Sequence, residues 1–202
     1  MLKSEFIPAL DVDSRRLMIV LHGLGDSAAG YRFMPEMVRE PSMNYLLVNA
    51  PDDYFGGYSW FDFEGDPKPG IERSVRSLSE LLDEQRKQGF PTEQTVLFGF
   101  SQGCLLCLEV GCTYPHPLAG CIGISGWLRD AEDLLSRLSP CVSSQRFMVT
   151  HGTHDPVLPF ERSKNQMQLL EQAGLGIEWH EFEKVHTIAP EEWGLMHAFI
   201  NP

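Results

Sequence analysis

A serine flanked by glycines lies near the middle of the chain, in the segment Gly99-Phe100-Ser101-Gln102-Gly103. The segment fits the pattern G-x-S-x-G, and it joins a short apolar run that predicts a strand to a run that predicts a helix. At such a junction a tight turn points the serine hydroxyl out of the sheet, and the helix directs backbone N–H groups toward it. We therefore expect Ser101 to be a nucleophile. The alternative is a glycine-rich turn with an incidental serine.

A base must lie beside this hydroxyl, because serine is otherwise a weak nucleophile. In hydrolases built around such a turn, an acid and then a histidine follow the serine along the chain. Asp155 comes shortly after the apolar run 147–150, and His186 lies between the run 177–182 and the last helical pattern. Both would then lie at the carboxyl edge of a sheet, where Ser101 also lies. We predict that these three residues form a catalytic triad.

Other acids and histidines fit these roles less well. Asp130 and Asp133 come at or near the start of a helical pattern, where acids stabilise the first turn. His180 lies within a predicted strand, and His197 lies within the last predicted helix. Three further histidines adjoin the predicted site and are assigned supporting roles: His22, His151 and His154.

A second glycine-rich segment, HGLGD at 22–26, follows the first strongly apolar run. In this architecture the loop after that strand supplies one backbone N–H to the oxyanion, and the residue after the nucleophile supplies another. We assign these roles to Leu24 and Gln102. The alternative is that the glycines of this segment only turn the chain.

The segment 51–70 is rich in glycine, proline and aromatic residues and shows little regular periodicity. A long loop in a compact domain is usually functional. Because it follows a predicted strand, it should lie at the same sheet edge as Ser101. We predict that Tyr58, Trp60 and Phe61 line a groove for an apolar acyl group. The alternative is that these rings only pack the loop onto the core.

Short apolar runs alternate with helical patterns along the chain. Strands are predicted at 17–21, 45–48, 96–100, 121–124, 147–150 and 177–182, and helices around 71–82 and at 102–112, 130–138, 161–173 and 190–200. This alternation predicts an α/β fold with a mostly parallel central sheet and helices on both faces. In such sheets ligands bind at the carboxyl ends of the strands.

The composition suits one domain spanning residues 1–202, with 43% hydrophobic and 22% charged residues. A formal net charge of −12 disfavours nucleic acid as a partner, because such a surface repels phosphate backbones. The apolar runs are too short for an integral membrane protein. The first residues also lack the apolar stretch of an export signal, so a cytoplasmic location is expected.

The five cysteines are an odd number, which favours reduced thiols over a disulfide framework. Cys104 and Cys107 form a C-x-x-C, but they lie inside a predicted helix and no second pair exists. This placement favours packing over zinc or redox chemistry. Nucleotide-binding loops and the H-E-x-x-H motif are absent from the sequence, so we expect neither a metal nor a cofactor.

Taken together, these segments resemble the acyl-protein thioesterase, carboxylesterase and lysophospholipase family of serine esterases. The matching segments are LHGLGDS (21–27), SWFD (59–62), GFSQG (99–103), ISG (124–126), HGTHDPVLP (151–159) and HTIAPEE (186–192). The resemblance runs in order over nearly the whole chain. It implies an α/β-hydrolase fold without a large cap domain, and it supports the triad and the oxyanion donors assigned above.

Two positions depart from the family pattern, which usually has glycine where this chain has Cys104 and Val185. The resemblance leaves the substrate open among small esters, lysolipids and acylated proteins, and it is compatible with a homodimer. Two other functions also stay open. One is hydrolysis of another bond, such as a peptide or a lactone, and the other is a non-catalytic binding module that retains the fold. An intact triad argues against the binding module.

Overall fold

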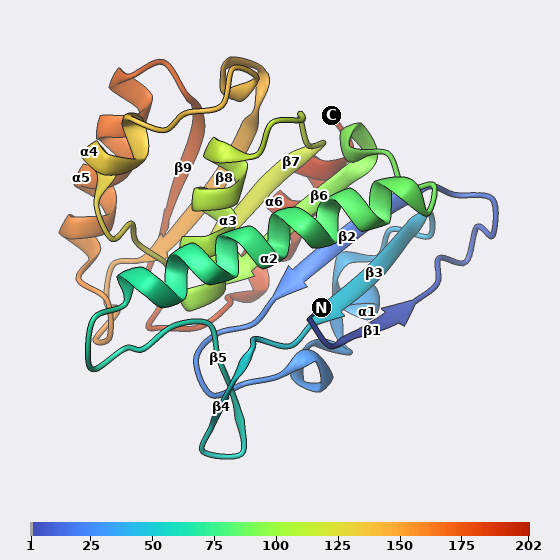
Figure 1. Cartoon of the computed structure of the whole chain (residues 1–202), viewed down its shortest axis with the longest axis horizontal. Coiled ribbons are helices and arrows are strands. Elements are labelled where there is room, and N and C mark those ends of the chain that lie inside the picture. Colours follow the sequence, from blue (N-terminus) through green and yellow to red (C-terminus); the bar gives the residue numbers. More distant parts are fainter. Residues whose placement is uncertain (1) are drawn as a thin grey trace.

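The computed structural model describes residues 2–202, and a seven-stranded sheet forms its centre (Figure 1). The strands are β1 (Ser4–Ile7), β2 (Arg16–Leu21), β3 (Met43–Val48), β6 (Thr95–Phe100), β7 (Gly120–Ile124), β8 (Arg146–Gly152) and β9 (Gly176–Phe182). Their order across the sheet is β1-β3-β2-β6-β7-β8-β9. The edge strand β1 pairs antiparallel with β3, and all other neighbouring pairs are parallel. The six runs predicted as strands lie in β2, β3 and β6 to β9, so that prediction is confirmed.

Helices cover both faces of this sheet (Figure 1). One face carries α2 (Lys68–Lys87), α3 (Gln102–Thr113), α4 (Ala131–Leu135) and α5 (Phe160–Gln172), and the other carries α1 (Met34–Val38) and α6 (Pro190–Ile200). Along β2, Leu17, Ile19 and Leu21 pack into the core on the first face, whereas Met18 and Val20 pack into the core on the second. Strands buried on both faces are apolar at every position, which explains the unbroken apolar runs in the sequence. The predicted α/β fold is confirmed.

The segment 51–70 has more regular structure than the sequence indicated. β4 (Asp52–Tyr54) and β5 (Gly57–Ser59) form an antiparallel hairpin that projects from the sheet (Figure 1). Phe55 and Gly56 connect the two strands, and both have positive φ values, 45° and 91°. Positive φ at both central residues is what a two-residue hairpin turn of this kind requires. Phenylalanine is a rare choice there, which is why the sequence did not predict the hairpin.

The helix predicted at 130–138 is shorter, since α4 ends at Leu135. The side chain of Asp130 caps its start by accepting a hydrogen bond from the backbone N–H of Asp133 at 3.0 Å. Beyond α4, Ser139 precedes Pro140, and a residue before proline is disfavoured in the helical region. Three single 3-10 turns complete the secondary structure of residues 2–202: Ala28–Tyr31, Thr92–Gln94 and Val142–Ser144. None of the helices in this range is long and apolar enough to cross a membrane.

Candidate active site

Ser101 lies in a sharp turn between β6 and α3, with φ 54° and ψ −115°. Its backbone N–H donates to the carbonyl of Ile124 at 3.0 Å, which ties the turn to the neighbouring strand. A Cβ atom on Gly99 would lie 2.0 Å from the carbonyl oxygen of Gly103, and one on Gly103 would lie 2.2 Å from that of Leu21. Only glycine therefore fits at both positions. The turn holds a non-glycine residue at positive φ, a strained conformation that clusters at functional sites.

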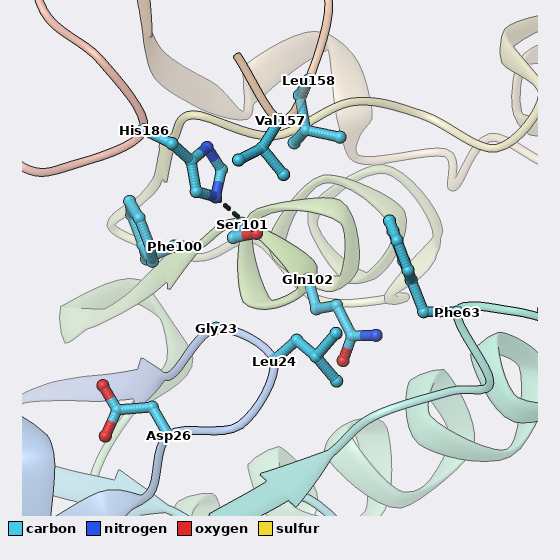
Figure 2. Close-up of a pocket in the computed structure, with 10 residues that line it drawn as sticks. All are labelled: Gly23, Leu24, Asp26, Phe63, Phe100, Ser101, Gln102, Val157, Leu158 and His186. Atoms are coloured by element: carbon cyan, nitrogen blue, oxygen red, sulfur yellow. Dashed lines mark hydrogen bonds between the residues drawn. The ribbon is translucent and has the colours of Figure 1, made fainter. Parts of the chain in front are cut away.

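Of the three residues predicted as a triad, His186 lies within hydrogen-bonding distance of both Ser101 and Asp155. His186 Nε2 lies 2.9 Å from Ser101 Oγ, and His186 Nδ1 lies 2.7 Å from Asp155 Oδ2. Figure 2 shows the imidazole ring above the serine, with the bond between them drawn as a dashed line. The ring lies 5.0 Å from the ring of Phe100, centroid to centroid.

The carboxylate of Asp155 is held from two sides, and its side chain has no exposed surface. Its Oδ1 accepts hydrogen bonds from the backbone N–H groups of Val157 at 2.8 Å and Leu158 at 3.0 Å. Burial alone would raise the pKa of Asp155, but these N–H groups and the bond to His186 outweigh burial, so that its pKa is below the ordinary value. The carboxylate therefore stays ionised and accepts the Nδ1 proton of the histidine.

Leu24 and Gln102, the predicted oxyanion donors, both line the pocket beside Ser101 (Figure 2). Their backbone N–H groups donate to no acceptor among residues 2–202. Gly103 brings the start of α3 against the strand that leads into the Leu24 loop, because its Cα packs on the carbonyl groups of Leu21 and His22. Two residues from separate elements, each with an unpaired backbone N–H, thus line the same pocket as Ser101.

His22 supports the loop that carries Leu24. Its Nε2 accepts the backbone N–H of Ala50 at 3.1 Å, so Nδ1 carries the proton and donates to the carbonyl of Gly23 at 2.6 Å. Burial lowers the pKa of His22, which favours this neutral form. The Gly23 carbonyl belongs to the same peptide unit as the Leu24 N–H, so the histidine fixes the direction of that N–H. The supporting role expected for His22 agrees with this geometry.

The side chain of Gln102 has a function that the sequence did not indicate. Its Oε1 accepts the backbone N–H of Trp60 at 3.0 Å, and its Nε2 donates to the carbonyl of Phe61 at 3.1 Å. The indole N–H of Trp60 in turn donates to the carbonyl of His22 at 2.9 Å. These bonds fasten the segment after β5 to both sides of the site.

The residues predicted to line an acyl groove lie elsewhere. Trp60 and Phe61 are buried in the core, with exposed fractions of 0% and 1%. Tyr58 is half-buried and lies against His22, with ring centroids 6.3 Å apart. None of the three lines the pocket beside Ser101. The alternative, that these rings pack the loop onto the core, describes Trp60 and Phe61, because both belong to the buried core cluster on that face of the sheet.

Instead, a pocket of about 250 Å³ beside Ser101 is lined by other apolar side chains. In Figure 2, Val157 and Leu158 lie above the serine, Phe63 lies to its right and Phe100 lies to its left. Phe63 belongs to the aromatic loop that was expected to wall an acyl groove, whereas the sequence did not indicate Phe100, Val157 or Leu158. Val157 and Leu158 come two and three positions after Asp155, in the loop that follows β8, so their position was a signal that could have revealed them.

The competing acids and histidines do not approach Ser101 within hydrogen-bonding distance. Asp133 pairs with Arg137 at 2.7 Å, and Asp130 caps α4. His180 pairs with Glu178 at 2.8 Å. His197 contacts the Val38 carbonyl, His151 is buried with a pKa lowered by burial, and His154 is exposed.

Both departures from the family pattern fit without disturbing the triad. Cys104 is buried at the start of α3, where a Cβ on Gly126 would lie 2.4 Å and one on Gly123 would lie 2.7 Å from its sulfur. These two glycines leave room for the thiol. Val185 is 54% exposed and does not have a positive φ, so its backbone conformation does not require glycine. Cys104 and Cys107 are both free and buried, with pKa values raised by burial.

The sheet, the helices on both faces and the strand–turn–helix junction at Ser101 define an α/β hydrolase, and no large cap domain is inserted within residues 2–202. The model of the phospholipase/carboxylesterase family matches residues 2–202. The chain belongs to this family, and by that membership it is a carboxylic ester hydrolase.

Known relatives agree in sequence and in structure. The chain is 32% identical over 197 residues to acyl-protein thioesterase 1 of Schizosaccharomyces pombe, covering 90% of this chain and 88% of that protein. It is 28% identical to a probable carboxylesterase of Oryza sativa subsp. japonica, covering 93% and 77%. Its structure resembles the crystal structure of esterase PE8 with a TM-score of 0.89 and 28% identity, covering 99% and 98%. The Bacillus cereus carboxylesterase shares the fold, with 20% identity and a TM-score of 0.85 over 100% of this chain and 94% of that one.

Proposed function

We propose that this protein hydrolyses carboxylic esters and thioesters of apolar acyl groups, with Ser101 as nucleophile, His186 as base and Asp155 as the orienting acid. The observation that carries this proposal is the unbroken chain of hydrogen bonds, 2.9 Å from Ser101 to His186 and 2.7 Å from His186 to Asp155. The strained turn at Ser101 and the adjoining apolar pocket support the same reading.

In the first half of the reaction, His186 Nε2 takes the hydroxyl proton as Ser101 Oγ attacks the carbonyl carbon. Asp155 holds Nδ1–H and stabilises the imidazolium. The backbone N–H groups of Leu24 and Gln102 stabilise the oxyanion of the tetrahedral intermediate. His186 then gives its proton to the departing alcohol or thiol. This leaves an acyl group on Ser101.

In the second half, His186 removes a proton from a water molecule as that water attacks the acyl-enzyme. Collapse of the second intermediate releases the carboxylic acid and returns the proton to Ser101. Each step uses only groups of this chain, water and the substrate.

The pocket beside Ser101 favours an apolar acyl group. Phe63, Val157 and Leu158 present hydrocarbon toward it, and each methylene buried there contributes up to about 0.8 kcal/mol. The similarity to acyl-protein thioesterase 1 supports thioesters of acylated proteins as substrates, beside small esters. Lysolipids offer the same acyl chemistry and belong in the same substrate panel.

The test uses the wild type, Ser101→Ala and Ser125→Ala. Ser125 is a matched control, because it also follows a strand end at positive φ (49°) but is buried outside the pocket. We expect Ser101→Ala to lose about 10⁴-fold or more in kcat on p-nitrophenyl butyrate and butyryl thioesters, with its fold unchanged. It should also lose labelling by a fluorophosphonate probe, whereas Ser125→Ala should keep both. An active Ser101→Ala, with contaminating esterase excluded, would overturn the assignment.

A further inference from the structure

The loop that carries His186 has little regular structure of its own. It connects the end of β9 at Phe182 to the start of α6 at Pro190. Within it, Lys184 N–H donates to the Phe182 carbonyl and Thr187 N–H donates to the Val185 carbonyl, both at 2.8 Å. Such short-range bonds bend a chain but do not fix where the bend lies relative to the rest of the molecule. The distances from His186 to its two partners must be fixed by other contacts.

The carbonyl of Lys184 accepts the backbone N–H of His154 at 3.2 Å, and a buried carboxylate contacts the loop at both ends. Glu192, in the first turn of α6, accepts Lys184 Nζ at 2.6 Å and the backbone N–H of Ala189 at 2.5 Å. It also accepts the hydroxyl of Thr150, which lies in β8. Lys184 lies near the start of the loop, two positions before His186, and Ala189 lies at its end, three positions after His186. The carboxylate therefore ties both ends of the loop to α6 and to the strand that leads to Asp155.

The lysine and the carboxylate are both enclosed. The side chain of Lys184 is 4% exposed and that of Glu192 is 0% exposed. Burial lowers the pKa of Lys184, and the hydrogen bond and charge of Glu192 oppose that shift. Four other polar groups lie around the pair: Thr150, Cys104, His151 and Asp155. Burial favours the neutral forms of the thiol and the imidazole, because it raises the pKa of Cys104 and lowers that of His151, and Asp155 belongs to the proposed triad.

Stability alone does not account for such a pair. An apolar pair of similar volume often stabilises a core as well as a buried ion pair does, because the charges lose their hydration. What an apolar contact does not provide is direction, since a methylene group tolerates sliding that a hydrogen-bonded ammonium does not. The carbonyl of Lys184 lies where a Cβ on Gly152 would be 2.3 Å away, so the loop is also packed tightly against the end of β8.

We propose that Lys184 and Glu192 are positioning residues for His186, and that their ion pair holds the imidazole at hydrogen-bonding distance from both Ser101 and Asp155. This inference rests on the proposed function for its kinetic consequence, but the geometric consequence stands independently. The pair touches no substrate atom. It acts through the loop backbone.

The test compares the double variant Lys184→Met/Glu192→Gln with the wild type. Methionine keeps the length of the lysine. Glutamine keeps one oxygen for the backbone N–H of Ala189, and its NH₂ group can donate to the hydroxyl of Thr150, so no unpaired charge is buried. We expect a melting temperature near that of the wild type. We expect kcat per fluorophosphonate-titrated site to fall about 10- to 100-fold, because small displacements of a base have such effects. KM should stay within roughly twofold.

The matched control is Lys164→Met/Glu181→Gln, which removes an ion pair of similar length, 2.8 Å, from the surface. Its kcat should equal that of the wild type. A second test variant, Thr150→Val, removes one donor to the carboxylate and no charge, so it reports on positioning even if the double variant fails to fold. We expect a fall in kcat of several fold, on the order of a lost hydrogen bond.

Proton NMR provides a readout that does not depend on turnover. The His186 Nδ1–H bonded to Asp155 should give a downfield signal, assigned by its loss in Asp155→Asn. We expect this signal to shift or broaden in the double variant and in Thr150→Val, and to stay unchanged in the surface control. An unchanged signal with unchanged kcat per site in folded variants would overturn the positioning role, as would a change in KM alone. If the wild type neither hydrolysed esters nor reacted with the probe, the proposed function would fail while the signal still tested the positioning.

Discussion

Replacing Asp155 with asparagine tests whether the acid fixes the tautomer of His186. Asp155 Oδ1 accepts the backbone N–H groups of Val157 and Leu158, at 2.8 and 3.0 Å, while Oδ2 faces His186 Nδ1 at 2.7 Å. An asparagine should keep its oxygen on the two N–H groups, because the flipped amide would place its NH₂ against both. Each buried donor left unpaired costs about 1–3 kcal/mol, so the flip costs about 2–6 kcal/mol.

The NH₂ group of the asparagine would therefore face Nδ1 of His186, and the imidazole proton would move to Nε2. A nitrogen that already carries a proton cannot accept one from Ser101. We expect kcat to fall about 10³- to 10⁴-fold, which corresponds to about 4–5.5 kcal/mol in the activation barrier. KM should change little. Steady-state kinetics on p-nitrophenyl butyrate measures both values, with circular dichroism as the check of folding. A kcat within about tenfold of the wild type would refute the tautomer argument.

Three further predictions concern the pocket, the packing behind the nucleophile and the response to acid. Across p-nitrophenyl esters of increasing chain length, kcat/KM should rise about fourfold per methylene until the pocket is full. Phe63→Ala should flatten that rise, and a variant in which kcat/KM rises as steeply with chain length as in the wild type would show that Phe63 does not line the acyl site. Gly126→Ala should cost about 1–3 kcal/mol in urea unfolding because of the contact with Cys104, and Cys104→Gly should relieve most of that cost, whereas additive effects would contradict the contact. Burial lowers the pKa values of His22 and His151, so below about pH 6.5 the unfolded chain binds protons that the native chain does not. The melting temperature should therefore fall as the pH drops below about 6.5, and it should fall less steeply in His151→Gln.

The sheet and the tight turn at Ser101 could be predicted because their signals are local. A strand buried on both faces is apolar at every position, and the tight turn at Ser101 requires glycines at fixed offsets that no other residue can replace. The order of Asp155 and His186 along the chain then left few candidates. Chain order and strand ends were enough to select residues that lie within hydrogen-bonding distance in the structure.

The aromatic loop could not be interpreted in the same way. An aromatic residue in a loop has the same sequence signature whether its ring faces a pocket or the core, and only the packing decides. The rings of Trp60 and Phe61 point inward because the side chain of Gln102 is hydrogen-bonded to their backbone, whereas Phe63 makes no such bond and lines the pocket. The ion pair between Lys184 and Glu192 could not be predicted either, because a lysine in a loop is ordinarily exposed to solvent.

The backbone contact at Gly103 has a consequence for how this enzyme can change over time. The spacing between the two proposed oxyanion donors, Leu24 and Gln102, depends on a helix start lying against the carbonyl groups of Leu21 and His22, with no side chain between them. Substitutions among the apolar residues of the core can therefore alter stability, expression and thermal tolerance while the spacing of the two donors stays the same. Chains that drift far apart in sequence can keep one chemistry in this way, and directed evolution can repack the interior for robustness without first re-establishing catalysis.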